Sequence, residues 1–334
     1  MRAAVLQRFN EPLEVTERPA PQPSDGEVLV RVRATGLCGT DLKLVSGALA
    51  SIRPPVIPGH EVAGEVVAAS DGLADGQRVA AYMYETCGHC RTCRLGHTTV
   101  CPNLVRIGLE RDGGLAEYMR LRRENALPID ESVPFAAAAV AMDSVLTPWC
   151  ALRRRAQLQA GEDLVVVGAG GLGLNAVQIA RTLGARVAVI EPQAGHRARA
   201  RELGAELTLA PEDLEAVRAW ADGGADVALD SSGASSGFRA ALGSVRRGGR
   251  VVCCGYQVGV DYAFESSRLV LEEITLLGAR VGTREDARDV LRAVENGSIR
   301  PVIMDAIPLE GVNEALDRLR AGEVLGRLVV DMDR

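Results

Sequence analysis

Four of the eight cysteines in this chain lie in one short stretch, and their spacing could bind a metal ion. They follow the pattern Cys-x2-Cys-x2-Cys-x7-Cys, at Cys87, Cys90, Cys93 and Cys101. Four thiolates with no open position make a closed tetrahedral site, which is typical of structural zinc. A 4Fe–4S cluster is the competing interpretation. Because sulfur would fill the coordination sphere, His89 and His97 in the same loop are expected to be exposed.

A glycine-rich turn in the middle of the chain has the spacing of a dinucleotide-binding motif. An apolar run, 165–167, leads into Gly168, Gly170, Gly171, Leu172 and Gly173 and then into a helical stretch. Gly168 allows a tight turn, Gly170 lets the backbone approach a pyrophosphate, and Gly173 allows close packing of helix on strand. The phosphates are expected at the helix N-terminus, where free N–H groups favour anions.

An acidic residue after the next apolar run bears on the choice of cofactor. Glu191 follows the run 186–190, about 20 residues beyond the glycines, where a carboxylate accepts from adenosine ribose hydroxyls. A carboxylate there repels the additional 2′-phosphate of NADP, so NAD is favoured. His196 and Arg197 lie close behind and could partly offset the acid, which leaves NADP as the alternative. The plain structural interpretation of Glu191 is a surface acid at a strand end.

Three further segments hold residues that could do chemistry, but they are dispersed along the chain. Cys38 lies in Gly-Leu-Cys-Gly-Thr-Asp, His60 and Glu61 lie in Pro-Gly-His-Glu, and Asp143 lies in Met-Asp-Ser. Each also has a structural interpretation: Cys38 as a small core residue, His60 as a hydrogen-bonded loop residue, and Asp143 as a helix N-cap. Spacing alone does not assemble them into a site.

The elements that must position these residues are of two kinds. Short alternating runs at 27–33, 62–67 and 78–80, broken by glycine and proline, indicate an antiparallel β domain. From residue 163 onward, strand-like runs alternate with helical stretches, which predicts a doubly wound parallel sheet. The strand candidates are 164–167, 186–190, 226–229, 250–254 and 275–277, and helices are expected at 172–183 and 285–295. Two short strands, around Val302 and at 328–330, could return to the first domain.

Composition limits the classes of protein that this chain could be. With 334 residues it has room for two domains, and 47% hydrophobic with 25% charged residues is an ordinary globular balance. No apolar run approaches the roughly 20 residues of a membrane span, and no signal peptide is evident, which predicts a cytoplasmic protein with no membrane partner. The net charge of −6 argues against nucleic acid as a partner. A zinc-stabilised nucleic-acid-binding protein is therefore the weaker alternative.

Together these motifs resemble the zinc-containing medium-chain dehydrogenase/reductase family, the alcohol and polyol dehydrogenases. The resemblance runs nearly the whole chain, and its most specific parts are Gly59-His60-Glu61-x2-Gly64, the four-cysteine loop and the glycine turn. It implies an α/β protein with a GroES-like β-rich catalytic domain at 1–144 and 281–334, which carries the structural-zinc loop 87–101. It also implies a Rossmann coenzyme domain at 145–280. The implied activity is hydride transfer between NAD(H) and a small-molecule alcohol/carbonyl pair.

The resemblance gives roles to the dispersed residues. It implies that Cys38, His60 and Asp143 bind a catalytic zinc with a fourth position open, which makes two zinc ions per chain together with the cysteine loop. Many family members carry cysteine or glutamate where Asp143 stands. Glu61 is expected to support the site or to bind the ion transiently. Asp41 is expected to orient His60 through its other ring nitrogen.

The same resemblance predicts a proton path. Thr40 is similar to the family's hydroxyl that passes the alcohol proton towards the cofactor ribose. Lys43 stands where several relatives have a histidine as the exit of this path. Either Lys43 or bulk water completes the relay, or Lys43 contacts ribose or phosphate.

Other residues inherit roles around the cofactor and the substrate. Thr147 and Leu172 are expected near the nicotinamide ring. Arg327 lies where relatives carry a pyrophosphate-facing arginine, and a surface charge is its alternative interpretation. The substrate pocket is expected to be lined by Met83, Trp149 and Leu49, although Trp149 could equally be a core residue.

Two other reductases on the same fold are alternatives. A zinc-free quinone reductase lacks the four-cysteine loop and the Cys/His pair, so this sequence argues against it. A zinc-containing reductase that acts on an iminium or conjugated C=C bond can have the same ligands. Because family members assemble as dimers or tetramers, a homodimer or homotetramer is expected.

Overall fold

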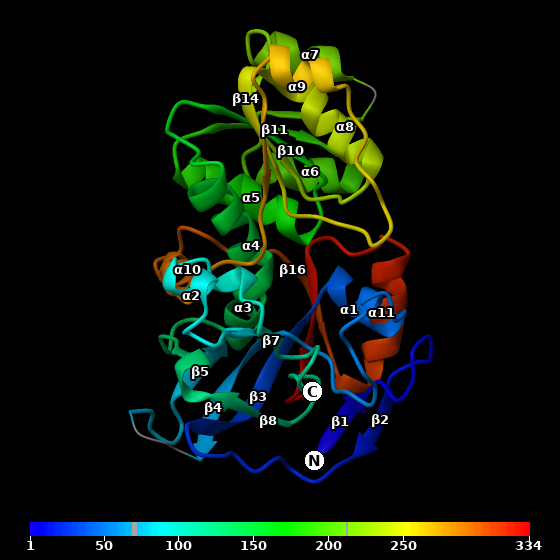
Figure 1. The fold of residues 1–334 in the computed structure, drawn as a ribbon. Helices are drawn as coiled ribbons and strands as arrows, with labels where there is room; N and C mark the ends of the chain where they lie inside the picture. Colours follow the sequence, from blue (N-terminus) through cyan, green and yellow to red (C-terminus); the bar gives the residue numbers. More distant parts are fainter. Residues whose placement is uncertain (69–71, 212) are drawn as a thin grey trace. The chain divides into compact units, whose positions relative to one another are not determined.

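The computed structural model describes residues 1–68, 72–211 and 213–334, and the chain divides into two compact units (Figure 1). Unit 1 comprises Met1–Asp143, Thr283–Gly297 and Ile303–Arg334. Unit 2 comprises Ser144–Gly282 and Ser298–Val302. Unit 1 is thus assembled from segments that are far apart in the sequence.

Unit 1 is built on a seven-stranded sheet in which most neighbouring strands are antiparallel. Its path runs β16-β17-β3-β4-β5-β9, with β8 also paired to β3. The strands are β3 (Glu27–Leu37), β4 (Glu61–Ala68), β5 (Arg78–Ala81), β8 (Tyr118–Arg122), β9 (Ala126–Pro128), β16 (Ile303–Ile307) and β17 (Arg327–Asp331). Both the predicted antiparallel sheet and the return of two late strands to it are confirmed.

The alternation of side chains in β3 explains this sheet. Val28, Val30 and Val32 are buried, whereas Arg31, which lies between two of them, is exposed. The three valines pack in one core cluster with residues of β4 and β8, including Met119. A strand whose alternate residues are apolar buries one face against such a core.

The remaining elements of unit 1 are short strands and helices. The pairs β1–β2 and β6–β7 form separate antiparallel ribbons. These elements are β1 (Arg2–Val5), β2 (Glu14–Glu17), β6 (Tyr84–Glu85), β7 (Val105–Arg106), α1 (Gly39–Val45), α2 (Arg91–Arg94), α3 (Phe135–Val140), α10 (Arg284–Glu295) and α11 (Val312–Arg320), with 3₁₀ turns at Thr98–Val100, Arg123–Asn125 and Leu309–Gly311. The predicted helix 285–295 is confirmed as α10, and Thr283 with Asp286 forms a capping box at its start.

Unit 2 is a six-stranded parallel sheet with the strand order β12-β11-β10-β13-β14-β15. The strands are β10 (Asp163–Val167), β11 (Arg186–Ile190), β12 (Leu207–Leu209), β13 (Ala225–Asp230), β14 (Val245–Cys253) and β15 (Thr275–Gly278). The helices are α4 (Leu146–Trp149), α5 (Gly171–Thr182), α6 (Ala194–Glu202), α7 (Leu214–Trp220), α8 (Ser235–Ser244) and α9 (Ser266–Leu271), with a π-helical turn at Cys150–Arg155. The predicted doubly wound sheet is confirmed.

Two predicted boundaries are wrong by several residues: β3 continues to Leu37, beyond the predicted run 27–33, and β14 begins earlier than predicted. The sequence predicts a strand at 250–254, but β14 begins at Val245. Pairing of β14 with β13 shifts register between Ala225 and Val227, so the segment before Arg250 is an irregular start to the strand. The glycines at 248 and 249 interrupt the apolar pattern there, which is why periodicity places the start too late.

Both faces of the parallel sheet are buried, which explains the continuous apolar runs in its sequence. Val165 and Ile190 lie in one core cluster with Phe238 of α8 and Val217 of α7. In β10 the intervening Val166 is also fully buried. Because both faces are covered, a ligand can reach this sheet at its edge. In open parallel sheets that edge lies at the carboxyl ends of the strands, where polar groups of unit 2 can meet a ligand.

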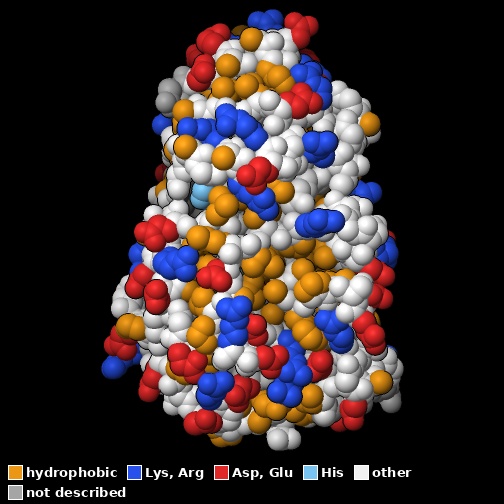
Figure 2. All heavy atoms as spheres, turned by 180° about the vertical axis from the view of Figure 1, so that it is seen from behind, with side chains coloured by type: hydrophobic (Ala, Val, Ile, Leu, Met, Phe, Trp, Pro, Cys, Tyr) orange, Lys and Arg blue, Asp and Glu red, His pale blue; other side chains and the backbone are white. Residues whose placement is uncertain are grey.

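One helical segment among the described residues, Phe135–Arg155, is long and apolar enough to cross a membrane by composition. In the structure, 83% of its most apolar window is buried, as in a core helix of a soluble protein. Asp143 interrupts its apolar sequence. Figure 2 shows acidic, basic and hydrophobic side chains together on the visible face of the molecule.

Candidate active site

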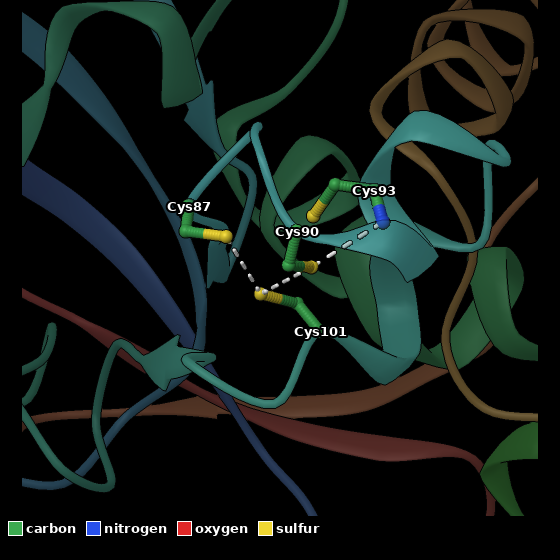
Figure 3. A group of neighbouring side chains, drawn as sticks. All are labelled: Cys87, Cys90, Cys93 and Cys101. Atoms are coloured by element: carbon green, nitrogen blue, oxygen red, sulfur yellow. Dashed lines mark hydrogen bonds between the residues drawn. The ribbon is translucent and has the colours of Figure 1, made fainter.

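The four clustered cysteines point their sulfur atoms towards one another, as Figure 3 shows. All four Sγ atoms lie within 4.8 Å of one another, and none forms a disulfide. Cys101 Sγ lies 3.5 Å from Cys87 Sγ and 3.9 Å from Cys90 Sγ. A disulfide bond is about 2 Å long, so these sulfurs are close without being bonded. Four unbonded sulfurs at this spacing fit tetrahedral ligation of one metal ion.

The short helix α2 positions Cys90, which directly precedes it, and Cys93, which lies within it. Cys90 precedes α2, and its Sγ accepts a hydrogen bond of 3.4 Å from the backbone N–H of Cys93. The Thr92 hydroxyl and this N–H lower the pKa of Cys90 to about 6. A thiolate, the form that binds metal, is therefore favoured at Cys90. His89 and His97 are exposed, as expected.

A second cluster brings the dispersed residues together inside unit 1. Donor atoms of Cys38, His60, Glu61 and Asp143 all lie within 4.8 Å of one another, and the four residues are buried. Asp143 Oδ2 lies 3.4 Å from Cys38 Sγ and 3.9 Å from His60 Nε2. One sulfur, one imidazole nitrogen and carboxylate oxygens form a donor set that zinc accepts. Glu61 Oε2 is also buried without a hydrogen-bond partner among the described residues, so this donor set fits a bound metal ion.

Two paired strands and a helical turn position these donors. Cys38 directly follows β3 and stands at the N-cap of α1, while His60 directly precedes β4. Because β3 and β4 are antiparallel neighbours, with Gly36 opposite Glu61, both strand ends meet at one place. Asp143 lies in a π-helical turn, Ala141–Val145, a geometry that often marks functional sites. Its interpretation as a helix N-cap is wrong, since α4 is preceded by Val145.

Asp41 positions two of the donor residues, Cys38 and His60. Its Oδ2 accepts a hydrogen bond of 2.8 Å from the Cys38 N–H, and its Oδ1 lies 3.4 Å from His60 Nδ1. His60 therefore turns Nδ1 towards Asp41 and Nε2 towards Asp143. Although burial disfavours the charged ring, Asp41 and Cys38 raise the pKa of His60 well above its ordinary value.

The two carboxylate oxygens of Glu61 have different surroundings. Oε1 accepts a hydrogen bond of 2.9 Å from Arg327 Nε, whereas Oε2 is buried without a hydrogen-bond partner among the described residues. Burial raises the pKa of Glu61 to about 7, and Arg327 opposes this shift. Oε2 lies over Gly36, where an added Cβ would be 2.1 Å away. Sequence reasoning missed Gly36, although an isolated glycine within a strand signals a close approach.

Arg327 lies within this cluster and not on the surface. Its side chain is 5% exposed, and its Nη2 lies 3.6 Å from Asp143 Oδ2 and 3.5 Å from Cys38 Sγ. The interpretation of Arg327 as a surface charge is therefore wrong. Its predicted contact with a cofactor pyrophosphate stays a prediction.

Helix α1 carries the two residues of the predicted proton path. The Thr40 hydroxyl lies 3.7 Å from Cys38 Sγ. Lys43 follows one turn later and is half-buried. Burial lowers the pKa of Lys43, while the charges of Cys38 and Asp143 oppose this shift. Both residues thus lie within electrostatic reach of the cluster.

The glycine turn of unit 2 has a different geometry at each glycine. Gly168 has φ +88°, a conformation that only glycine adopts readily. A Cβ at Gly173 would lie 1.9 Å from the carbonyl oxygen of Gly168, whereas a Cβ at Gly170 would meet nothing within 4 Å. Gly171 begins α5, and Leu172 is its second residue. The turn is therefore tight at both ends and open in the middle, where its backbone can meet a ligand.

Glu191 is buried directly after β11, so its interpretation as a surface acid is wrong. Its carboxylate accepts hydrogen bonds from the backbone N–H groups of Ala169, at 2.7 Å, and Gln193, at 2.9 Å. It thereby ties the glycine turn to the end of β11. Arg197 donates to the backbone carbonyl of Glu191 and not to its carboxylate, and His196 is buried in α6.

The residues predicted around the nicotinamide and the substrate are largely buried. Thr147 is buried in α4, and Leu172 is half-buried. Met83 and Leu49 are buried in unit 1. Trp149 is buried in unit 2, where the Arg153 guanidinium lies 4.7 Å from the centre of its ring.

Comparison with known proteins gives a consistent result. Residues 24–131 match the family described as "Alcohol dehydrogenase GroES-like domain", and residues 171–296 match "Zinc-binding dehydrogenase". An alcohol dehydrogenase of Moraxella sp. (strain TAE123) is 35% identical, with 99% of each chain covered. The chain belongs to the zinc-containing medium-chain dehydrogenase/reductase family. Another alcohol dehydrogenase in this similarity range, from Geobacillus stearothermophilus, is 33% identical over 100% of both chains.

Solved structures agree with this membership of the medium-chain dehydrogenase/reductase family. A crystal structure titled as an NAD-dependent alcohol dehydrogenase has a TM-score of 0.94 at 29% identity, covering 99% of this chain and 100% of the other. The predicted family, its α/β fold and a zinc-dependent oxidoreductase are thereby confirmed.

Proposed function

We propose that this dehydrogenase oxidises small alcohols with NAD, or reduces the corresponding carbonyls with NADH, at the cluster of Cys38, His60 and Asp143. The observation that carries this proposal is the convergence of three kinds of donor within 4.8 Å in a buried part of unit 1. The names of the similar proteins support an alcohol as substrate. No observation favours an iminium or a conjugated C=C bond.

In this proposal each residue has a separate task. Cys38, His60 and Asp143 would hold the catalytic zinc ion. When bound, the ion would supply Lewis-acid polarisation of an alcohol oxygen, and NAD would supply the hydride acceptor. Asp41 fixes the orientation of His60.

The remaining residues transfer the alcohol proton and balance the local charge. Thr40, one residue before Asp41 on α1, accepts the alcohol proton and passes it on. Lys43 or solvent receives it, and a lysine whose pKa is lowered by burial is suited to exchange protons. Arg327 pairs with Glu61 and so balances one of the acids behind the site.

The choice of NAD rests on Glu191. Its carboxylate accepts two hydrogen bonds from backbone N–H groups, which hold it in place at the end of β11. An anion there repels the 2′-phosphate of NADP, and Arg197 does not pair with it. The glycine turn, from Gly168 to Gly173, would receive the pyrophosphate.

The four-cysteine loop holds the second, structural zinc in this proposal. The division into a catalytic domain, 1–144 and 281–334, and a coenzyme domain, 145–280, is supported by the two compact units, which differ from it at residues 144, 281–282 and 298–302. All eight cysteines are free, which fits the reducing cytoplasm.

Exposed Val270 and Leu271 near the edge strand β15 support a homodimer or homotetramer, and sedimentation as a monomer would contradict it.

The activity is tested by absorbance at 340 nm. Purified protein is mixed with NAD and a panel of primary, secondary and polyhydric alcohols, and with NADH and the matching carbonyls. We expect turnover that a chelator abolishes and zinc restores, together with two zinc ions per chain. Cys38→Ser should remove one zinc ion and the activity while the protein stays folded. Two zinc ions without turnover on any alcohol or carbonyl would overturn the proposal.

A further inference from the structure

Asn175 is a fully buried polar residue of helix α5 that has no part in the proposed mechanism. Its Nδ2 donates hydrogen bonds of 2.9 Å to Ser144 Oγ and of 2.9 Å to the carbonyl oxygen of Gly171. The carbonyl oxygen of Ser144 lies 3.3 Å from the same nitrogen. An amide NH₂ has two hydrogens, so both are used on Ser144 and Gly171, which lie with Asn175 in unit 2.

Two donors fix the direction in which this amide points. The backbone N–H of Val302 and the side-chain Nε2 of Gln178 each donate to Asn175 Oδ1 at 3.3 Å. Because both groups are donors, they require the amide oxygen on their side. The NH₂ of Asn175 must therefore face Ser144 and Gly171.

Ser144 closes a ring of hydrogen bonds with these groups. Its hydroxyl donates to the Gly171 carbonyl oxygen at 3.0 Å, and its Oγ accepts from Asn175. Ser144 is fully buried, so bulk water does not reach this hydroxyl. Removal of the Asn175 amide would leave buried oxygens of Ser144 and Gly171 with one donor fewer each, which is unfavourable inside a protein.

The ring joins two segments that the proposed function uses. Ser144 is the next residue after Asp143, and both belong to the π-helical turn Ala141–Val145. The Asp143 carboxylate lies 3.4 Å from Cys38 Sγ in the donor cluster. Gly171 is the first residue of α5 and belongs to the glycine turn. Because neighbouring residues of one helical turn move together, a fixed Ser144 restricts the direction in which the Asp143 side chain points.

We infer that Asn175 is a positioning residue for two ligands: through Ser144 it orients the metal donor Asp143, and through Gly171 it holds the start of the helix at the glycine turn. This inference rests on the proposed function, in which Asp143 binds zinc and the glycine turn binds NAD. Residues that orient a metal ligand from outside contribute about 10–100-fold to metal affinity in other proteins. Asn175 should therefore affect the affinity for both ligands.

The first test is Asn175→Ala, which removes both donors of the ring. Zinc affinity is measured by competition with a chromogenic chelator, in the absence of NAD and alcohol. We expect the affinity of one of the two zinc sites to fall by about 10-fold, and that of the other to stay unchanged. Cys38→Ser, which removes the catalytic site, identifies the site that Asp143 serves. A folded Asn175→Ala protein with both zinc affinities unaltered would overturn the inference.

The second measurement is NAD affinity, followed by titration calorimetry without an alcohol. Asn175→Ala should weaken NAD binding by about 5-fold, the size expected from one lost hydrogen bond. Ser144→Ala keeps the bond from Asn175 to Gly171, so it should lower the affinity of the same zinc site but affect NAD less. On zinc affinity the two substitutions should be less than additive, because they break the same ring. Full additivity would show that they act separately and would contradict the inference.

Gln178 provides a matched control on the same helix. Its Nε2 donates to the carbonyl oxygen of Arg300 at 2.9 Å, and its Oε1 accepts from the Arg300 N–H at 3.0 Å. Gln178 contacts only the oxygen of Asn175, which Val302 also holds. Gln178→Ala should therefore leave both affinities unchanged. Equal losses of affinity in Gln178→Ala and Asn175→Ala would mark the effect as a general loosening of α5 and overturn the inference.

Two outcomes separate this inference from the proposed function. If Asn175→Ala does not fold, Ser144→Ala decides, and a folded Ser144→Ala protein with unaltered zinc affinity would overturn the inference. An unsubstituted protein that binds two zinc ions and NAD but turns over no alcohol or carbonyl would instead count against the proposed function. In that case the predicted changes in zinc and NAD affinity would still support the role of Asn175.

Discussion

Gly36 lies opposite Glu61 in the β3–β4 ladder, and the Glu61 carboxylate occupies the space that a side chain at position 36 would take. The same carboxylate is held by Arg327 on its other oxygen. The Glu61 carboxylate therefore has room only because Gly36 has no side chain, and the Arg327 guanidinium holds its other oxygen. Its place behind the metal donors depends on both.

Gly36→Ala should therefore displace Glu61 without removing any zinc ligand. An added Cβ 2.1 Å from Oε2 forces the carboxylate to move, at a cost of about 1–3 kcal/mol in the free energy of unfolding. We expect kcat/KM to fall by about 100-fold, as for other small misplacements in active sites. Kinetics and metal analysis check this, with Gly39→Ala as the control, because a Cβ there meets nothing within 4 Å. Equal activity in both variants would contradict the role of Gly36.

Sequence reasoning predicted some residues of this site and missed others. Cys38, His60 and Asp143 were predicted through family motifs, because their spacing in the chain is too wide to show that they meet. The pairing of Arg327 with Glu61 was not predicted, since the two residues are 266 positions apart. Such a contact depends on how the last strand joins the sheet, and no local pattern contains that information.

At the scale of elements, the loop between β6 and β7 has little apolar core of its own. Its helical turns are the short α2 and a 3₁₀ turn, and two of its three larger apolar side chains, Leu95 and Val100, are 60% and 54% exposed. Its order must come from the four cysteines. A loop without a core is ordered by its metal ion, as in small zinc domains.

Cys93→Ser should accordingly remove one zinc ion and destabilise the protein by about 2 kcal/mol or more, since loss of a metal is one of the largest single effects on stability. Zinc content and thermal unfolding check this prediction. Cys253→Ser is the matched control, because Cys253 lies in β14 outside both clusters. A Cys93→Ser protein that retains two zinc ions and its full stability would show that the loop holds no structural metal.

Elements with a long, regular period were predicted well, and short ones were not. The run from β10 through α5 to β11 has apolar residues at strand and then helix spacing, so its order and type follow from the sequence. The strands β6 and β7 have two residues each, too few to show a period. Their pairing is set by the loop that they bracket.

At the scale of the whole molecule, both donor clusters belong to unit 1 and the glycine turn belongs to unit 2. Metal and cofactor should therefore stabilise different parts of the chain. With a chelator, we expect faster amide hydrogen exchange in the segments around Cys87–Cys101 and His60. With NAD, we expect slower exchange around Gly168–Gly173. Binding of a ligand to the native state slows the local opening of its site.

Hydrogen exchange followed by mass spectrometry measures both effects in one protein. The parallel strands β13 and β14 serve as the internal reference for the chelator, because they lie in unit 2. Uniformly faster exchange in both units after chelation would show that the metal ions stabilise the chain as a whole.

The antiparallel pairing of β17 with β3 also bears on how this protein is made. Residues Ala34 to Leu37, which lead directly to Cys38, pair with Leu328 to Asp331. During synthesis on the ribosome, these late residues emerge only after all of unit 2 has been translated. Until then that part of β3 has an open edge, and Glu61 lacks its arginine. We therefore expect the catalytic metal to be acquired after the chain is complete, and unit 2 to be the first part of the protein to fold.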